Sequence, residues 1–192
     1  MPPQQICHEA EHHDATQGDE RYGYVSHLST MVPWVQMGGT RMNAITPNAG
    51  DHERLADKDS RFVDVAGLPW EDTKFPGVKA KTLLVDTASG LLTVLLKMDP
   101  GARLPDHEHV LIEQTYVLEG KLVDPDGICT AGNYVWRPAG TRHAAYTPDG
   151  GLMLAMFQAP NKFFERDGSV KDMLDRDWEE FWGTATNLAA QR

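Results

Sequence analysis

The stretch that decides the fold is PGARLPDHEHVLIEQTYVLEG, residues 100–120. It places His107, His109 and Glu113 within seven residues. Side chains at positions i and i+2 of a β-strand lie on one face of the sheet, so the two histidines are expected to point together. Glu113 opens the next strand-like run, and a tight turn over residues 110–112 would bring its carboxylate beside both imidazoles. Two imidazoles and a carboxylate on one side of an ion suit non-haem iron, and also manganese, nickel or zinc.

A further candidate ligand lies downstream in GNYVWRPAGTRHAAYTP, residues 132–148. His143 follows a Pro-x-Gly turn and begins a short run of its own, a placement that aims one side chain into the mouth of a barrel. Together with His107 and His109 it completes the histidines of the β-rich part of the sequence. We therefore predict one divalent metal per chain, held by these three histidines and by Glu113. Whether Glu113 binds the metal directly or through water stays open.

The rest of the sequence from residue 61 is typical of an antiparallel all-β sandwich or barrel. Short apolar runs such as KAKTLLVD, GLLTVLLKM and GLMLAMFQAP recur about every ten residues, as the strands of such folds do. DPG, DPDG, PAG and PDGG separate them, and these residues tolerate turn conformations. We expect residues 61–165 to form a metal-binding barrel.

The periodicity changes near the C-terminus, in SVKDMLDRDWEEFWG. Its apolar positions, spaced as on one face of a helix, are Leu174, Trp178, Phe181 and Trp182. Ser169 with Asp172 three residues later resembles a capping box, and Gly183 suits a helix end. Residues 166–192 are thus expected to form an amphipathic helix and a tail. Its aromatic face must be buried against the barrel or a second subunit.

Residues 1–60 are polar and lack a sustained period, so we expect a mobile extension there. Cys7, His8 and His12 of CHEAEHH could share a helix face and bind a metal, but nothing in that stretch would bury or orient them. The only other cysteine is Cys129, which leaves no disulfide framework.

Composition and charge indicate which partners and which cellular compartment to expect. A formal net charge of −10 and a pI near 5.2 argue against binding to nucleic acid or to an anionic membrane. The longest apolar run, GLLTVLL at residues 90–96, is too short to span a bilayer. The first twenty residues are acidic and have no apolar signal region. We expect a cytoplasmic protein.

The spacing of the histidine segments resembles that of the cupins, which carry the motifs G(x)5HxH(x)3-4E(x)6G and G(x)5PxG(x)2H(x)3N. The first motif is matched at every spacing by Gly101, His107, His109, Glu113 and Gly120. The second is matched by Gly132, Pro138, Gly140 and His143, with Thr147 in place of the final Asn. Because Thr147 is not a ligand position, the change leaves the predicted metal site intact.

The resemblance extends over about Phe62–Phe164 to the ChrR-like cupin subgroup, through PWEDTKFPGVKAKTLL and PNKFF among other segments. This subgroup includes acetylacetone-cleaving and dihydroxyacetophenone-cleaving dioxygenases and the C-terminal domain of a zinc anti-sigma factor. The resemblance implies an RmlC-like β-barrel, also called a double-stranded β-helix, with a divalent metal and usually a homodimer. It does not determine the reaction.

Several residues near the motifs are candidates for contact with a substrate. The candidates for lining a substrate pocket are Thr115, Ala145, Thr147, Tyr116 and Arg103. The first three are small and would share the inward face, leaving a pocket beside the metal. Arg103 could instead pair with Asp106. Gln114, Trp136, Arg137 and Tyr146 are further candidates for orienting a substrate, although a packing or surface role is favoured for each.

Iron(II) at this site would bring a carbonyl substrate and dioxygen together, so the favoured function is a dioxygenase that cleaves a C–C bond in a small diketone or hydroxyketone. One alternative is a non-redox isomerase or lyase in which the metal, zinc for example, is a Lewis acid. Another is a regulatory or sensor cupin without catalysis. The lack of a CxxC motif upstream counts against an anti-sigma factor.

Overall fold

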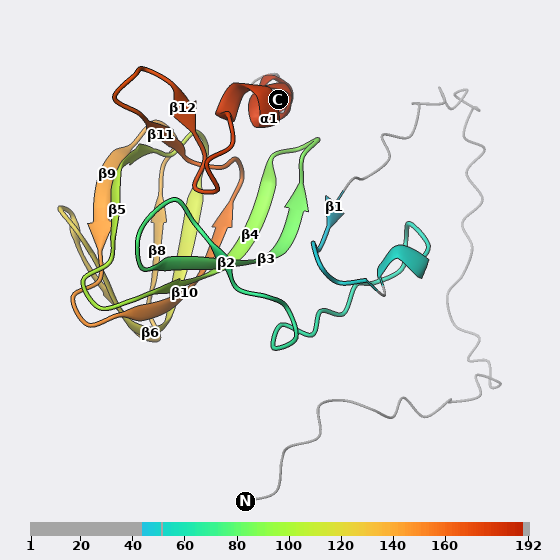
Figure 1. Cartoon of the computed structure of the whole chain (residues 1–192), viewed down its shortest axis with the longest axis horizontal. Helices are drawn as coiled ribbons and strands as arrows, with labels where there is room; N and C mark the ends of the chain where they lie inside the picture. The colour runs from blue at the N-terminus through green and yellow to red at the C-terminus, as the bar shows by residue number, and fades with distance from the viewer. Residues whose placement is uncertain (1–43, 51, 190–192) are drawn as a thin grey trace, which may run out of the picture. The chain divides into compact units, whose positions relative to one another are not determined.

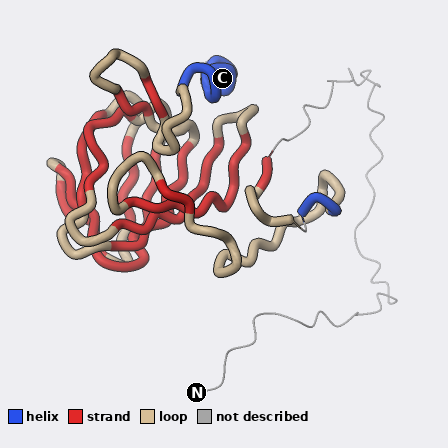
Figure 2. Tube along the Cα trace, viewed as in Figure 1, coloured by secondary structure: helices blue, strands red, loops and turns tan. Residues whose placement is uncertain are grey.

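The fold was analysed in a computed structural model that describes residues 44–50 and 52–189 (Figure 1). Strands dominate this part of the chain, in which helix is confined to η1 (His52–Arg54) and α1 (Trp178–Ala189) (Figure 2). The strands are β1 (Ala44–Ile45), β2 (Glu71–Asp72), β3 (Val78–Asp86), β4 (Leu91–Met98), β5 (Arg103–Glu108), β6 (Glu113–Asp124), β7 (Gly127–Thr130), β8 (Tyr134–Arg137), β9 (Arg142–Tyr146), β10 (Gly151–Phe157), β11 (Lys162–Phe164) and β12 (Val170–Lys171). The predicted all-β class is confirmed. Neither helix of the described part is long and apolar enough to cross a membrane.

The strands pair antiparallel along one path, β1-β3-β4-β10-β6-β9-β5-β11-β12. Strand β2 joins the path beside β3, and both β7 and β8 pair with β6. β6 belongs to two layers, because its first half pairs with β10 and β8 and its second half with β7 and β9. The path has two ends rather than closing on itself, so the fold is an open two-layered sandwich and not the closed barrel that the strand pattern allowed.

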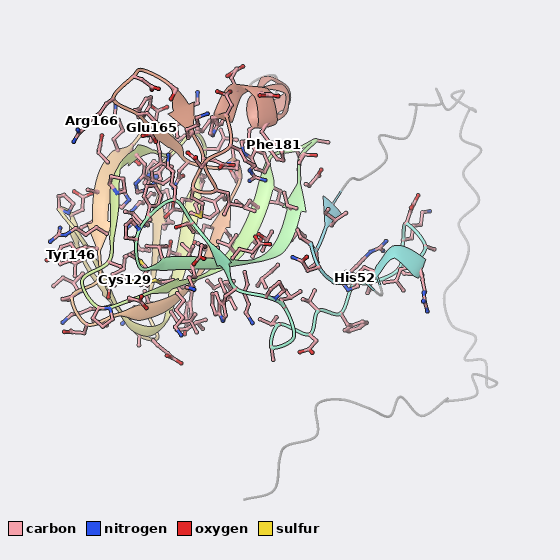
Figure 3. All side chains as sticks on the ribbon, in the orientation of Figure 1. His52, Cys129, Tyr146, Glu165, Arg166 and Phe181 are labelled. Carbon is pink, nitrogen blue, oxygen red and sulfur yellow. The ribbon has the colours of Figure 1, made fainter. Side chains whose placement is uncertain are left out.

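The core lies between the two layers, where side chains fill the space (Figure 3). Alternate residues of β4 and β10 point inward, as the period of two requires. The register sets Leu96 opposite Met153 and Val94 opposite Ala155, and all four are buried. Burying a large aliphatic side chain stabilises a fold by about 1.5–3 kcal/mol.

Part of the predicted N-terminal extension is structured. Ala44 and Ile45 add β1 to the edge of β3, and the hydroxyl of Thr46 donates to the carbonyl oxygen of Leu83 at 2.7 Å. The folded unit therefore begins before residue 61. Residues 1–43, with the CHEAEHH cluster, lie outside the described part of the chain.

The C-terminal helix begins at Trp178, not at Ser169 as predicted. Residues before it form β12 and a turn in which Asp175 has a φ of 66°, a left-handed conformation that interrupts a right-handed helix. The capping residue is Asp177, whose Oδ1 accepts a hydrogen bond from the amide of Glu180 at 3.0 Å. Local pattern alone could not distinguish this start from the earlier one, because both have a suitable capping side chain.

The aromatic face of α1 packs on its own chain. Trp178 and Trp182 are buried, whereas Phe181 is 41% exposed. The indole of Trp178 donates to the carbonyl oxygen of Pro160 at 3.0 Å, and that of Trp182 donates to Asp172 at 2.9 Å. The predicted end, Gly183, lies inside the helix. Figure 1 shows β11, β12 and α1 gathered at one end of the sheets.

Gly120, at a turn-like position within β6, provides a test of the fold. Its φ is +71°, and a Cβ there would lie 2.1 Å from the carbonyl oxygen of Gly150. Gly101 has a similar φ of +81° with open space around it. We expect Gly101→Ala to lower the free energy of unfolding by about 1–2 kcal/mol, the cost of a left-handed alanine. Gly120→Ala should cost at least twice as much, because the main chain must move. Urea denaturation measures both, and equal losses would contradict this packing.

Candidate metal centre

The three histidines of the motifs come together from two neighbouring strands. His107 lies near the end of β5 and is the direct cross-strand partner of His143 on β9. His109 follows β5, and its amide donates to the carbonyl oxygen of Thr141 at 2.9 Å, which extends the same ladder. One ring nitrogen from each histidine lies within 4.8 Å of the others, and all three side chains are buried.

Hydrogen bonds to the Nδ1 atoms fix the tautomers of two of these rings. Nδ1 of His107 is 2.8 Å from the carbonyl oxygen of Pro105, and Nδ1 of His143 is 3.0 Å from Oδ2 of Asp124. A carbonyl or a carboxylate can only accept, so both Nδ1 atoms carry the hydrogen. The Nε2 atom of each ring therefore keeps its lone pair.

The third ring is held in the same way through a hydroxyl group. Nδ1 of His109 is 2.8 Å from Oγ1 of Thr141, and that hydroxyl donates its own hydrogen to the carbonyl oxygen of Pro138 at 2.7 Å. Thr141 must then accept from His109. All three histidines thus present an Nε2 lone pair, the arrangement that partners at Nδ1 create in metal sites.

The donor atoms fit a divalent metal ion. Nε2 of His109 and of His143 are buried and have no hydrogen-bond partner among the described residues. Buried polar atoms are rarely left unpaired, and a bound cation would satisfy them. Burial lowers the pKa of all three histidines, that of His109 to about 4, so the rings are neutral at pH 7. Neutral imidazole is the form that binds metal.

Glu113, at the start of β6, lies beside the histidine cluster. Its Oε2 is 3.4 Å from Nε2 of His109 and accepts a hydrogen bond from Nδ2 of Asn161 at 2.6 Å. Its Oε1 accepts from the hydroxyl of Thr115 at 3.1 Å and from Arg137 at 3.4 Å. Burial raises the pKa of this carboxyl, but the charge of Arg137 and the hydrogen bond from Asn161 hold it below its usual range. Its direct ligation of a metal stays a prediction.

Arg137, interpreted from the sequence as a packing or surface residue, is a buried cation of the site. Its guanidinium contacts Oε1 of Glu113 at 3.4 Å and Oδ2 of Asp124 at 2.5 Å. Asp124 in turn holds His143, so one network joins the carboxylate to a histidine. Asp124 was not predicted from the sequence, because it lies in a DPDG segment that is typical of a turn. Asn161 was not predicted either, although it lies in the segment PNKFF that carries part of the family resemblance.

A small cavity of about 20 Å³ adjoins two of the histidines and Glu113. Its remaining lining residues are Leu96, Met98, Leu104, Thr115, Leu122, Ala145, Met153, Ala155, Phe157, Asn161, Phe163 and Met173. Thr115 and Ala145 lie where the sequence predicted them. The space is nevertheless smaller than expected, because methionine, leucine and phenylalanine side chains from other strands fill it. A cavity of this size holds about one water molecule.

The other pocket candidates lie elsewhere. Thr147 is fully buried but does not line the cavity. Tyr116 points to the outer face of β6 and is 38% exposed. The guanidinium of Arg103 lies over the ring of Tyr146, 4.7 Å from its centre, on the exposed side of β5. The carboxylate considered as a partner for Arg103 pairs with Arg142 instead.

Residues 58–162 match the ChrR cupin-like domain over more than half of the chain. The protein belongs to the ChrR cupin-like domain family. Similar solved structures include a proposed acetylacetone dioxygenase from Methylibium petroleiphilum PM1, with 21% identity and a TM-score of 0.55 over 71% of this chain and 98% of that chain. Among curated proteins, no sequence matches this cupin.

Two further structures have the same fold. The acetylacetone dioxygenase from Acinetobacter johnsonii is 18% identical with a TM-score of 0.51, over 69% of this cupin and 93% of that chain. An RmlC-like cupin from Ralstonia eutropha JMP134 is 18% identical with a TM-score of 0.54, over 70% and 89% of the two chains. At these identities the comparisons establish the cupin fold.

The contact between Asp124 and His143 predicts an effect on metal affinity. Asp124→Asn removes the charge that orients His143 and pairs with Arg137, so we expect zinc affinity to fall by about 10–100-fold. Asp126→Asn, an exposed change in the same turn, should leave the affinity unchanged. Competition with a chromophoric chelator measures both dissociation constants. Equal affinities for the Asp124 variant and the wild type would show that Asp124 does not support the site.

The lowered histidine pKa values predict how pH affects the metal-free cupin. The unfolded chain takes up a proton on His109 below about pH 6.5, whereas the folded protein resists this down to about pH 4. Stability should therefore fall as pH drops from 6.5 to 4, by roughly 3 kcal/mol from His109 alone. Urea unfolding with a chelator present tests this, and His109→Gln should flatten the pH dependence. A pH dependence unchanged in that variant would contradict the assignment.

Proposed function

We propose that this cupin is an iron(II)-dependent dioxygenase of the cytoplasm that cleaves a C–C bond in a small diketone or hydroxyketone. The observation that carries the proposal is the convergence of three neutral imidazoles, with free Nε2 lone pairs, beside a buried carboxylate and an apolar cavity. The fold shared with two structures described as acetylacetone dioxygenases supports the choice of a dioxygenase. Iron is chosen over zinc because cleavage with dioxygen requires redox chemistry, which zinc lacks.

His107, His109 and His143 would hold the ion, with Glu113 as the adjacent carboxylate. When bound there, iron(II) supplies the one-electron chemistry that dioxygen requires and polarises a substrate carbonyl. The protein contributes a buried, largely apolar setting. Arg137 and Asn161 keep Glu113 ionised and oriented.

Charge balance favours an anionic form of the substrate. The buried ionised groups around the histidines are Glu113, Asp124 and Arg137, which together carry one net negative charge. A divalent ion would leave one net positive charge in a buried site. A monoanionic enolate would neutralise it, and buried charges are stable only when compensated.

The size of the cavity favours a small substrate. Three methionines, Met98, Met153 and Met173, line it, and their unbranched side chains adapt readily to a ligand. A compound of a few heavy atoms can be accommodated by rotation of these side chains.

We also propose that the cupin forms a homodimer through the outer face of its larger layer. On this face Leu95, Leu154, Tyr116 and Tyr134 form one row of direct cross-strand neighbours on four adjacent strands. Trp136 lies in the next row and is 56% exposed. An apolar, aromatic surface of this kind is typical of protein interfaces.

Oxygen uptake tests the proposed reaction. The protein is loaded anaerobically with iron(II) and offered β-diketones, hydroxyacetophenones and 2-hydroxyketones, with zinc-loaded protein and His143→Ala as controls. We expect uptake that requires both iron and one of these substrates and that both controls abolish. No uptake at full iron occupancy would contradict the dioxygenase and favour a Lewis-acid isomerase or lyase, or a sensor.

A further inference from the structure

The side-chain amide of Asn161 contacts Glu113 through its nitrogen atom, and its oxygen atom makes no hydrogen bond among the described residues. It lies between β10 and β11, where it is 5% exposed, and its Nδ2 donates to Oε2 of Glu113 at 2.6 Å. Because an ionised carboxylate can only accept hydrogen bonds, the amide nitrogen must face Glu113 and the amide oxygen must face away. Among the described residues, that Oδ1 atom is buried and has no hydrogen-bond partner.

The side chain of Asn161 borders the cavity in which a ligand would lie. Asn161 lines the cavity beside the histidines and also a neighbouring cavity of about 20 Å³ between the sheet and the C-terminal segment. Phe157, Phe163 and Met173 line both cavities with it, and all three are apolar. A buried amide oxygen in such surroundings requires a hydrogen-bond donor.

The other polar groups of the metal-side cavity are already engaged. The hydroxyl of Thr115 donates to Glu113, and both oxygens of Glu113 accept hydrogen bonds from protein donors. The histidines present lone pairs to the metal position. A hydroxyl group on a ligand in this cavity would therefore find one acceptor without a protein partner, Oδ1 of Asn161.

We infer that Asn161 determines substrate specificity by accepting a hydrogen bond at Oδ1 from a hydroxyl group of the substrate, so that the site selects hydroxyketones over diketones of the same carbon skeleton. This inference rests on the proposed function, since it assumes a carbonyl compound at the histidine cluster. A diketone presents only acceptors, so it would leave the amide oxygen unpaired. A hydroxyketone adds the missing donor without adding a heavy atom.

The test uses the pair 3-hydroxybutan-2-one and butane-2,3-dione, which have identical skeletons. Both are titrated calorimetrically into zinc-loaded protein, where no oxidation occurs. We expect the wild type to bind the hydroxyketone about tenfold more tightly, the effect of one buried hydrogen bond. Asn161→Leu, which keeps the shape and loses the acceptor, should bind the two compounds with equal affinity.

Thr115→Val is the matched control, because it also removes a hydrogen-bond donor to Glu113 from the same cavity but leaves Oδ1 of Asn161 in place. Thr115→Val should keep the preference for the hydroxyketone. If Asn161 acted only by orienting Glu113, the two variants would change the affinities in the same way. Equal wild-type affinities, absence of binding by either compound, or a preference that persists in Asn161→Leu would overturn the inference. The wild-type comparison needs no variant to fold.

Oxygen uptake by the iron-loaded protein separates this inference from the proposed reaction. An Asn161-dependent preference without uptake of oxygen would leave the specificity intact and contradict the dioxygenase. Uptake of oxygen with equal affinities for the two compounds would support the dioxygenase and contradict the role of Asn161 in specificity.

Discussion

The rest of the site depends on the ion pairs that the buried guanidinium of Arg137 forms with Glu113 and Asp124. Arg137 on β8 is the direct cross-strand partner of Glu113 on β6, and it also reaches Asp124 at the far end of the same strand. β6 passes from one layer of the fold to the other, so one cation compensates a carboxylate in each layer. A buried charge without a partner is strongly destabilising, which makes this pairing a condition for keeping either carboxylate near the histidines. Asp124 then orients His143, and Glu113 is left ionised beside His109.

The fold prepares the histidines before any metal binds. Each Nδ1 atom is hydrogen-bonded to an acceptor, each ring is buried, and burial keeps each ring neutral. Three donor atoms with little freedom to rotate lose little entropy on binding an ion. The same burial makes the metal-free protein sensitive to acid. Function and stability at this site are therefore linked through the same three rings.

The sequence predicted those parts of the site that depend on local spacing. His107 and His109 share a motif, and His143 follows a recognisable turn, so strand geometry was enough to bring them together. The parts it missed depend on pairing between distant segments: Asn161 meets Glu113 across 48 residues, and Arg137 is buried only because β8 aligns with β6. The cavity was expected to be larger for the same reason. Met153 on β10 and Met173 before α1 reach it from segments whose pairing the sequence does not reveal. The start of α1 was misplaced because a left-handed Asp175 has no strong sequence signal.

The most direct test of the central claim is X-ray absorption at the zinc edge, on protein loaded with one zinc per chain. We expect three imidazole ligands, with zinc–nitrogen distances of about 2.0–2.1 Å, as in other histidine sites. Loss of one imidazole in His143→Ala would assign the third ligand. A coordination sphere of oxygen atoms with one imidazole or none would show that the three Nε2 atoms do not bind one metal ion.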